Sequence, residues 1–143
     1  MTKFSKKLSL VARDTNSSLK KFFNKNKYSY LAKPMKYGVF SGGKRFRSAI
    51  IINTGKIFNV NYKKLILIGA AVECVHSYSL IHDDLPTMDN DDFRRGKLST
   101  HKKFNESTAM LAGNSLLTLA YEILSSKQLV LSDKIKTNLI YKL

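Results

Sequence analysis

Apolar residues recur at spacings of three and four along most of the chain, a pattern typical of amphipathic helices. In the first segment they stand at Phe4, Leu8, Val11 and Leu19, which predicts a helix over residues 3–24. The same pattern predicts further helices over residues 28–37, 46–58, 62–82, 105–125 and 132–141. No alternation of apolar and polar positions persists for five residues, so we expect an all-α fold.

The segment over residues 62–82 is apolar on nearly every side, unlike its neighbours. A helix of this kind is normally buried at the centre of its domain. We expect breaks at Gly38 and at residues 41–43. After the central helix, Pro86 disfavours further helix, so residues 83–103 should be mostly helix end and loop. The length of 143 residues corresponds to a single domain.

Composition narrows the class of protein. The hydrophobic content of 43% is enough for a core, and the one cysteine, Cys74, excludes an intramolecular disulfide and a cysteine-based zinc site. The apolar run from residue 65 to residue 75 is interrupted by Glu73 and is too short to span a bilayer. Residues 1–15 lack the apolar region of a secretion signal. We therefore expect a soluble, cytoplasmic protein.

The formal net charge of +15 favours anionic ligands and non-specific adhesion to nucleic acid. Lysine provides twenty of the twenty-five cations, and Asn, Ile, Phe and Tyr are plentiful. An AT-rich genome would produce this profile without selection for a polyanionic partner. A basic protein that binds nucleic acid or a membrane surface is therefore an alternative, and we expect no specific nucleic-acid partner.

Five of the ten acidic residues lie within residues 83–92. Asp83, Asp84 and Asp89 are close enough to repel one another unless a cation is shared, and the electronegative end of the central helix lies beside them. Oxygen donors favour Mg²⁺, which bridges carboxylates to substrate phosphates. His76 stands two helical turns before Asp83 and points toward the same end. The alternative is an acidic loop that is only solvated.

A second cluster, Ser41 to Arg47, combines two glycines with Lys44, Arg45 and Arg47 at a helix start. Cations in a first helical turn are unfavourable, which suggests that an external anion binds there. A solvated basic turn is the alternative. The spacing from Gly38 to Lys44 matches a nucleotide-binding P-loop, but Arg45 replaces the required Ser or Thr, and we reject that assignment.

Arg94 and Arg95 follow the acidic stretch directly. They could neutralise its carboxylates, or they could hold phosphates from the side opposite a metal ion. Together the three clusters suit one phosphate bridged by metal and another bound by cations, beside the apolar wall of the central helix. Two phosphorylated apolar substrates would match this arrangement, one of them activated by Mg²⁺ for loss of its phosphate group.

Three stretches in order, GGKRFR (42–47), ECVHSYSLIHDDLPTMDNDDFRRG (73–96) and HKKFNESTAMLAGNSLLTLAYEIL (101–124), resemble the trans-isoprenyl diphosphate synthase family. The bacterial farnesyl type is the most similar, over about residues 35–124. The resemblance implies an all-α bundle around a deep apolar cavity, usually a homodimer. Since the family's members are about twice as long, this chain would be the amino-terminal half of the isoprenoid synthase helical bundle.

The resemblance also implies roles for single residues. Asp83, Asp84 and Asp89 would form the first aspartate-rich motif, in which Asp83 and Asp89 bind Mg²⁺ against the allylic diphosphate; Arg94 would contact that diphosphate. Four residues would bind isopentenyl diphosphate: Lys44, Arg47, His76 and Arg95. By the family's mechanism the allylic diphosphate leaves, the carbocation is attacked by the isopentenyl double bond, and a proton is lost.

Tyr78, five residues before Asp83, could face the cavity and limit the product to fifteen carbons, or it could simply pack in the core. Asn90 stands where close relatives carry another Asp. After Leu124 the only acid is Asp133, so the family's second aspartate-rich motif is missing. We therefore expect a prenyltransferase by family whose activity is impaired. The alternatives are a non-catalytic remnant of a truncated gene or, less favoured, a basic nucleic-acid-binding protein.

Overall fold

The computed structural model describes residues 2–25 and 29–143. Over these residues the chain forms seven helices and one short hairpin. In order they are α1 (Lys3–Lys25), α2 (Ala32–Phe40), α3 (Phe46–Ile57), α4 (Tyr62–Asp83), β1 (Phe93–Arg94), β2 (Lys97–Leu98), α5 (Thr100–Lys103), α6 (Glu106–Ser125) and α7 (Asp133–Lys142). The fold is all-α, as the sequence predicts.

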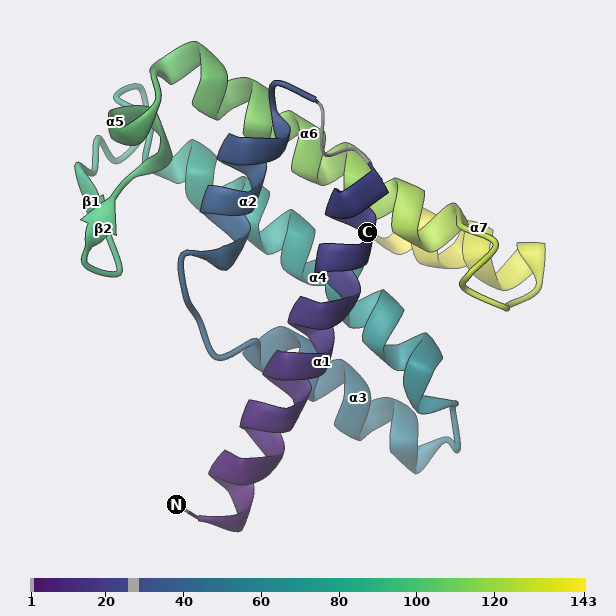
Figure 1. The fold of residues 1–143 in the computed structure, drawn as a ribbon. Coiled ribbons are helices and arrows are strands. Elements are labelled where there is room, and N and C mark those ends of the chain that lie inside the picture. The colour runs from purple at the N-terminus through teal and green to yellow at the C-terminus, as the bar shows by residue number, and fades with distance from the viewer. Residues whose placement is uncertain (1, 26–28) are drawn as a thin grey trace.

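Helix α4 is the centre of the molecule, with α6 antiparallel beside it and α1 and α3 across its other sides (Figure 1). The main core joins buried residues of α1, α2, α4 and α6. They include Leu19, Phe22, Phe23, Val39, Ala70, Ala71, Cys74, Leu116, Ala120 and Ile123. The predicted central, buried helix is therefore confirmed. The hairpin and α5 lie at the end of the bundle where α4 stops and α6 begins (Figure 1).

Small residues let α4 and α6 approach closely. Ala70 and Ala71 of α4 and Ala112 and Gly113 of α6 are all buried. A Cβ on Gly113 would collide with the imidazole of His82, whose Nε2 lies 3.1 Å from the Met110 carbonyl oxygen. This close packing fixes the end of α4, where the predicted acidic cluster begins.

Two parts of the fold differ from the sequence prediction. Helix α2 runs through Gly38 instead of breaking there, because Gly38 packs against the side chain of Ile81, 2.5 Å from where a Cβ would stand. The predicted loop contains the hairpin, in which Phe93 pairs with Leu98. Arg95 and Gly96 both have positive φ (53° and 73°), as a two-residue hairpin turn requires. Of the predicted helix 28–37, residue 28 lies outside the described residues.

The expectation that the central apolar segment is too short to span a bilayer does not hold for the whole of α4. Helix α4 is long and apolar enough to cross a membrane by length and composition alone, but it packs against α1, α3 and α6 and forms the core. Cys74, also on α4, is fully buried, and burial raises the pKa of its thiol to about 12. A thiol with this pKa is unreactive at neutral pH.

Candidate active site

The acidic cluster forms where α4 ends. Asp83 is the last residue of the helix and Asp84 follows as its cap. The loop then returns, and the backbone N–H of Asp89 donates a hydrogen bond to the Asp83 carbonyl oxygen at 2.8 Å. This bond brings the backbones of Asp83 and Asp89 together, with Asp83 half-buried and Asp89 exposed. Two of the three predicted acids are therefore neighbours with access to solvent.

Asp84 is different, because its carboxylate is buried and bound by Arg94. The Nε of Arg94 donates to both carboxylate oxygens, at 2.7 and 2.9 Å, and its Nη2 lies 2.6 Å from Oδ1. The hydrogen bond to Asp84 raises the pKa of Arg94, and the nearby Asp91 and Asp83 add to this effect. Arg94 thus neutralises one carboxylate of the cluster, the first of the two roles open for it from the sequence.

The donor chemistry of this cluster suits a magnesium ion only in part. Within residues 2–25 and 29–143, no three His, Cys, Asp or Glu side chains converge closely enough to hold a metal ion. Asp83 and Asp89 offer carboxylate oxygens at an electronegative helix end. Mg²⁺ commonly takes one or two carboxylates and completes its shell with water and substrate phosphate. These two acids are compatible with that mode of binding.

The glycine-rich turn before α3 is held in unusual backbone conformations. Gly42, Gly43 and Arg45 have φ of 122°, 106° and 51°, the last being costly for a residue with a Cβ. Lys44 is exposed between them, whereas Arg45 is only 4% exposed. The turn therefore directs neighbouring cations in opposite directions, one to solvent and one into the protein.

Arg45 precedes α3, and its guanidinium bonds to three other helices, α2, α1 and α4. Its Nη2 donates to the Val39 carbonyl at 2.6 Å, its Nε to Asn16 Oδ1 at 2.9 Å, and its Nη1 to Glu73 Oε2 at 3.3 Å. The other oxygen of Glu73 accepts the backbone N–H of Ser48 at 3.3 Å. Glu73 of α4 therefore caps the first turn of α3 from outside the helix.

This capping changes the interpretation of the cations at the start of α3. The sequence suggests an external anion to offset them, but Glu73 already provides an internal negative charge there. Arg45 is consequently unavailable to a ligand. Lys44 and Arg47 are exposed and remain the cations of this turn that can reach a bound anion.

Arg47 and His76 meet at the surface of α3 and α4. The Nη1 of Arg47 lies 3.3 Å from Nε2 of His76. Partial burial lowers the pKa of His76, and the positive charge of Arg47 lowers it further. A neutral His76 can accept the hydrogen bond of Arg47 and keep its other nitrogen as a donor. Two residues predicted to bind one diphosphate are thus in direct contact.

Arg95 extends from the hairpin to the glycine-rich turn. It donates a hydrogen bond to the Gly42 carbonyl oxygen, and its guanidinium fills the space where a Cβ on Gly43 would stand. Burial lowers the pKa of Arg95, and the positive charge of Arg45 contributes. The structure therefore brings Arg95 to the same turn as Lys44, although the two are far apart in sequence.

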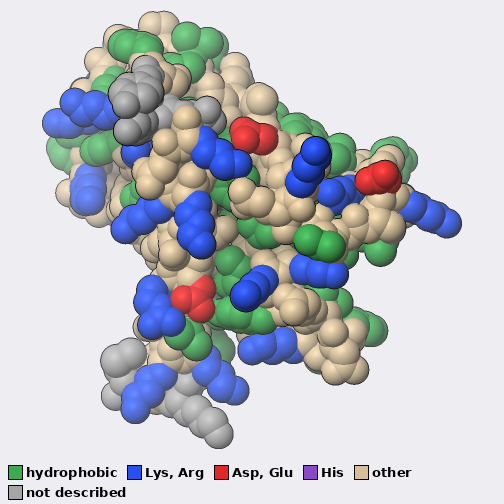
Figure 2. All heavy atoms as spheres, turned by 45° about the vertical axis from the view of Figure 1, so that its right-hand side comes forward, with side chains coloured by type: hydrophobic (Ala, Val, Ile, Leu, Met, Phe, Trp, Pro, Cys, Tyr) green, Lys and Arg blue, Asp and Glu red, His purple; other side chains and the backbone are tan. Residues whose placement is uncertain are grey.

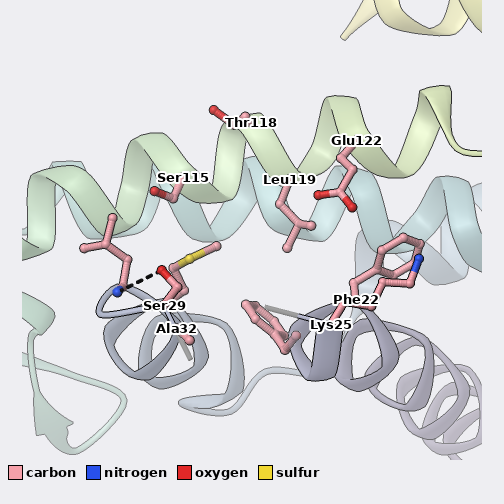
Figure 3. Close-up of a pocket in the computed structure, with 11 residues that line it drawn as sticks. Phe22, Lys25, Ser29, Ala32, Ser115, Thr118, Leu119 and Glu122 are labelled. Carbon is pink, nitrogen blue, oxygen red and sulfur yellow. Dashed lines mark hydrogen bonds between the residues drawn. The ribbon is translucent and has the colours of Figure 1, made fainter. Parts of the chain in front are cut away.

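A small cavity of about 20 Å³ separates the acidic cluster from α2. It is lined by Tyr37, Gly38, Ser41, Ser77, Leu80, Ile81, Asp84, Arg94, Leu98, Ser99 and Thr100. Larger cavities lie elsewhere. The one in Figure 3, of about 490 Å³, opens between the end of α1, α2 and α6, where Phe22, Ala32 and Leu119 line it. No residue predicted for the site is among its described lining residues.

Tyr78 lies on α4 and packs against the main core. Its ring meets the imidazole of His82 edge to face, with centroids 4.6 Å apart, and it is half-buried beside the main core. Tyr78 is not among the described lining residues of the cavities of about 490, 460 and 640 Å³.

Sequence reasoning missed the buried ion pair. Glu73 is the one acid inside an otherwise apolar segment, and Arg45 stands in a cationic run, so both carried a signal. A buried carboxylate requires a partner. The periodicity of the sequence does not show that Arg45 and Glu73, 28 positions apart, are partners.

Comparison with known proteins shows the family of the chain. A model of the polyprenyl synthetase family matches residues 28–140. A farnesyl diphosphate synthase of Buchnera aphidicola is 60% identical over 98 residues, which cover 68% of this chain and 35% of that protein. The farnesyl diphosphate synthase of Escherichia coli is 41% identical over 143 residues, covering 98% of this chain and 48% of that protein.

Solved structures give the same result. A crystal structure of an FPP/GFPP synthase from Zymomonas mobilis superposes with a TM-score of 0.89 at 38% identity, covering 99% of this chain and 51% of that one. A geranyltransferase from Legionella pneumophila gives a TM-score of 0.84 at 36% identity. Nearly all of this chain is matched in these two comparisons, but it spans only about half the length of each relative. It belongs to the polyprenyl synthetase family, as an all-α chain similar to farnesyl diphosphate synthases.

Proposed function

We propose that this chain carries part of a magnesium-dependent prenyl transfer site, in which isopentenyl diphosphate is condensed with dimethylallyl or geranyl diphosphate. The observation that supports this most directly is the hairpin. Its adjacent arginines reach opposite ways, Arg94 to Asp84 in the acidic cluster and Arg95 to Gly42 in the cationic turn. The hairpin therefore connects the acidic cluster at the end of α4 with the glycine-rich turn before α3, which carries the cations.

The cationic group suits the diphosphate of isopentenyl diphosphate. Lys44, Arg47, His76 and Arg95 would bind it there. Arg47 and His76 are in contact, and Arg95 lies against the glycine-rich turn that carries Lys44. Guanidinium groups bind phosphate oxygens with paired hydrogen bonds, and exposed amides of a glycine turn can add to them.

The acidic group suits the allylic diphosphate. Asp83 and Asp89 would bind Mg²⁺, which supplies Lewis-acid stabilisation of the departing diphosphate when it is bound. Asp84 would hold Arg94 at a fixed angle, so that the free edge of this guanidinium contacts the same diphosphate. The apolar side chains of α4 would exclude water from the allylic cation.

Three finer assignments belong to the same proposal. Tyr78 would limit the growing chain to fifteen carbons from its position five residues before Asp83. Relatives of this chain carry names for more than one product length, including a geranylgeranyl pyrophosphate synthase of Arabidopsis thaliana.

The protein would be cytoplasmic and would act as a homodimer.

The test is incubation of the purified chain with Mg²⁺, geranyl diphosphate and labelled isopentenyl diphosphate. Formation of a labelled fifteen-carbon diphosphate, abolished by Asp83→Ala, supports the proposal. Binding of both diphosphates without turnover supports the non-catalytic alternative instead. A third result would contradict both the prenyl transfer site and the non-catalytic alternative. In it, the chain binds no diphosphate but binds nucleic acid in a salt-sensitive way that Asp83→Ala does not change.

A further inference from the structure

A groove of about 310 Å³ lies on the side of α2 that faces the hairpin and α5. We call it the lysine groove, and define it by its lining: Lys33, Lys36, Tyr37, Phe40, Ser41, Lys97, Lys103 and Phe104. The residues from α2 are spaced by three and four, so they share one face of that helix. The opposite wall comes from β2, α5 and the residue after α5.

Tyr37 fixes the two walls of the lysine groove relative to each other. Its hydroxyl donates a hydrogen bond to the Leu98 carbonyl at 2.7 Å. Its ring meets that of Phe104 edge to face, with centroids 5.6 Å apart. Phe40 is anchored from the other side by a similar contact with the buried Phe23, at 5.7 Å. The floor is therefore aromatic and held in place before any ligand arrives.

Four lysines (Lys33, Lys36, Lys97 and Lys103) and no acidic residue are among the described residues that line the lysine groove. None of the four lies within 4.0 Å of a carboxylate among the described residues, whereas the neighbouring Lys102 pairs with Asp92 at 2.9 Å. The residues outside the description (Met1, Asn26, Lys27 and Tyr28) include no acid. Like charges around one concavity repel, and a bound anion would relieve that repulsion.

Positive charge alone does not distinguish this groove, because Lys and Arg are spread over the whole face drawn in Figure 2. The other grooves differ in composition. One has both Lys25 and Glu122 among its lining residues, and another has Asp14 as well as Lys21 and Lys63. A third, between α1 and α3, has two lysines among ten lining residues. In the lysine groove, four of the eight lining residues are lysines and three are aromatic.

We propose that the lysine groove binds a small amphiphilic phosphate ester, with the phosphate held by the lysines and a short apolar body against the aromatic floor. Its volume is near the lower limit of about 300 Å³ for small-molecule sites. It lies beside the proposed active site but is distinct from it. Tyr37 and Ser41 also line the small cavity at Asp84, yet no residue proposed to bind substrate lines the groove. The site goes beyond the proposed function and does not depend on it.

The experiment is a titration of the whole chain with hexyl phosphate, followed residue by residue by NMR. Inorganic phosphate and hexanol are titrated separately, because each presents only one half of the ligand. Hexyl phosphate should bind more tightly than either and shift the signals of Tyr37 and Phe104. Shifts at Arg47 and His76 report the proposed active site, so failure of one proposal can be told from failure of the other.

Two variants test which groups bind. Replacing the four groove lysines (Lys33→Gln, Lys36→Gln, Lys97→Gln, Lys103→Gln) should weaken binding of hexyl phosphate about tenfold, the effect of roughly one charge-assisted hydrogen bond. A control variant removes the same charge from exposed lysines elsewhere: Lys6→Gln, Lys20→Gln, Lys127→Gln and Lys134→Gln. Phe104→Leu should weaken hexyl phosphate but leave inorganic phosphate unchanged.

Several results would overturn the proposal. If the groove-lysine variant and the control variant weaken binding of hexyl phosphate equally, the effect is due to the net charge of the protein and not to the groove. Shifts confined to Arg47 and His76 would leave the groove empty. Binding to phosphatidylglycerol vesicles without any response to hexyl phosphate would assign the lysines to a membrane surface instead. Circular dichroism of each variant, with an unchanged melting temperature, ensures that loss of binding is not loss of fold.

Discussion

Replacing Arg45 by Met should destabilise the protein far more than an ordinary substitution of a charged residue. Arg45 is 4% exposed and Glu73 is 2% exposed, so the change leaves a buried carboxylate without its cation. Removing one partner of a buried ion pair costs about 3–5 kcal/mol. The bonds to Val39 and Asn16 are lost as well. Total stabilities of about 5–15 kcal/mol are usual, so a large share of the total is at risk.

The assay is urea unfolding followed by circular dichroism, which reports the loss of helix. Arg45→Met should lower the free energy of unfolding by about 3–5 kcal/mol. The control is Arg13→Met, since the Arg13 side chain is 72% exposed and, among the residues that the structure describes, pairs only with its neighbour Asp14. Exposed pairs contribute about 0–1 kcal/mol, so this variant should differ little from the wild type.

The double variant Arg45→Met/Glu73→Met separates two costs: the loss of the ion pair, and the penalty of leaving the Glu73 carboxylate buried without a cation. Because it leaves no buried charge unpaired, it should be more stable than Arg45→Met alone. A loss of under about 1 kcal/mol for Arg45→Met, comparable to that of an exposed pair, would refute the reasoning. So would a double variant less stable than either single one.

Three further predictions concern the core and the site. Since the pKa of His76 is lowered by burial and by Arg47, the unfolded chain binds more protons between that lowered pKa and about 6.5. Stability should therefore fall as the pH drops through this window, and His76→Gln should remove that contribution in urea unfolding at a series of pH values. Gly113→Ala should cost about 1–3 kcal/mol in the same assay because its Cβ would displace His82. Leu116→Ala, in the fully buried contact of α6 with α4, should cost about 2–5 kcal/mol, and a loss below 1 kcal/mol in thermal unfolding would contradict its place in the core.

The helices could be predicted because burial imposes a period on the sequence. The apolar positions of α1 and α6 fall on one face, and the all-round apolar character of α4 marks it as central. The capping residues gave local support: the Asn105 side chain accepts the Thr108 N–H at 2.7 Å. These signals lie within a few residues of the structure that they specify, so sequence pattern is sufficient for them.

The remaining features depend on contacts between distant segments. Gly38 resembles a helix breaker in sequence, but it is required by the close approach of Ile81. Arg45 resembles its cationic neighbours, and only the position of Glu73 makes it a buried structural residue. The acids and cations of the candidate site could be named from their motifs. The sequence could not show which of these residues are available to a ligand and which pair with each other, because that depends on which carboxylate Arg94 reaches.

The central claim is that the acidic end of α4 and the cationic turn before α3 together bind diphosphates with a metal ion. The most direct measurement is calorimetric titration of the chain with geranyl diphosphate, with and without Mg²⁺, for the wild type and for Asp83→Asn/Asp89→Asn. We predict that Mg²⁺ strengthens binding to the wild type and has no effect on the double variant. Binding that is equally strong without Mg²⁺, or an equal effect of Mg²⁺ on both proteins, would contradict the account.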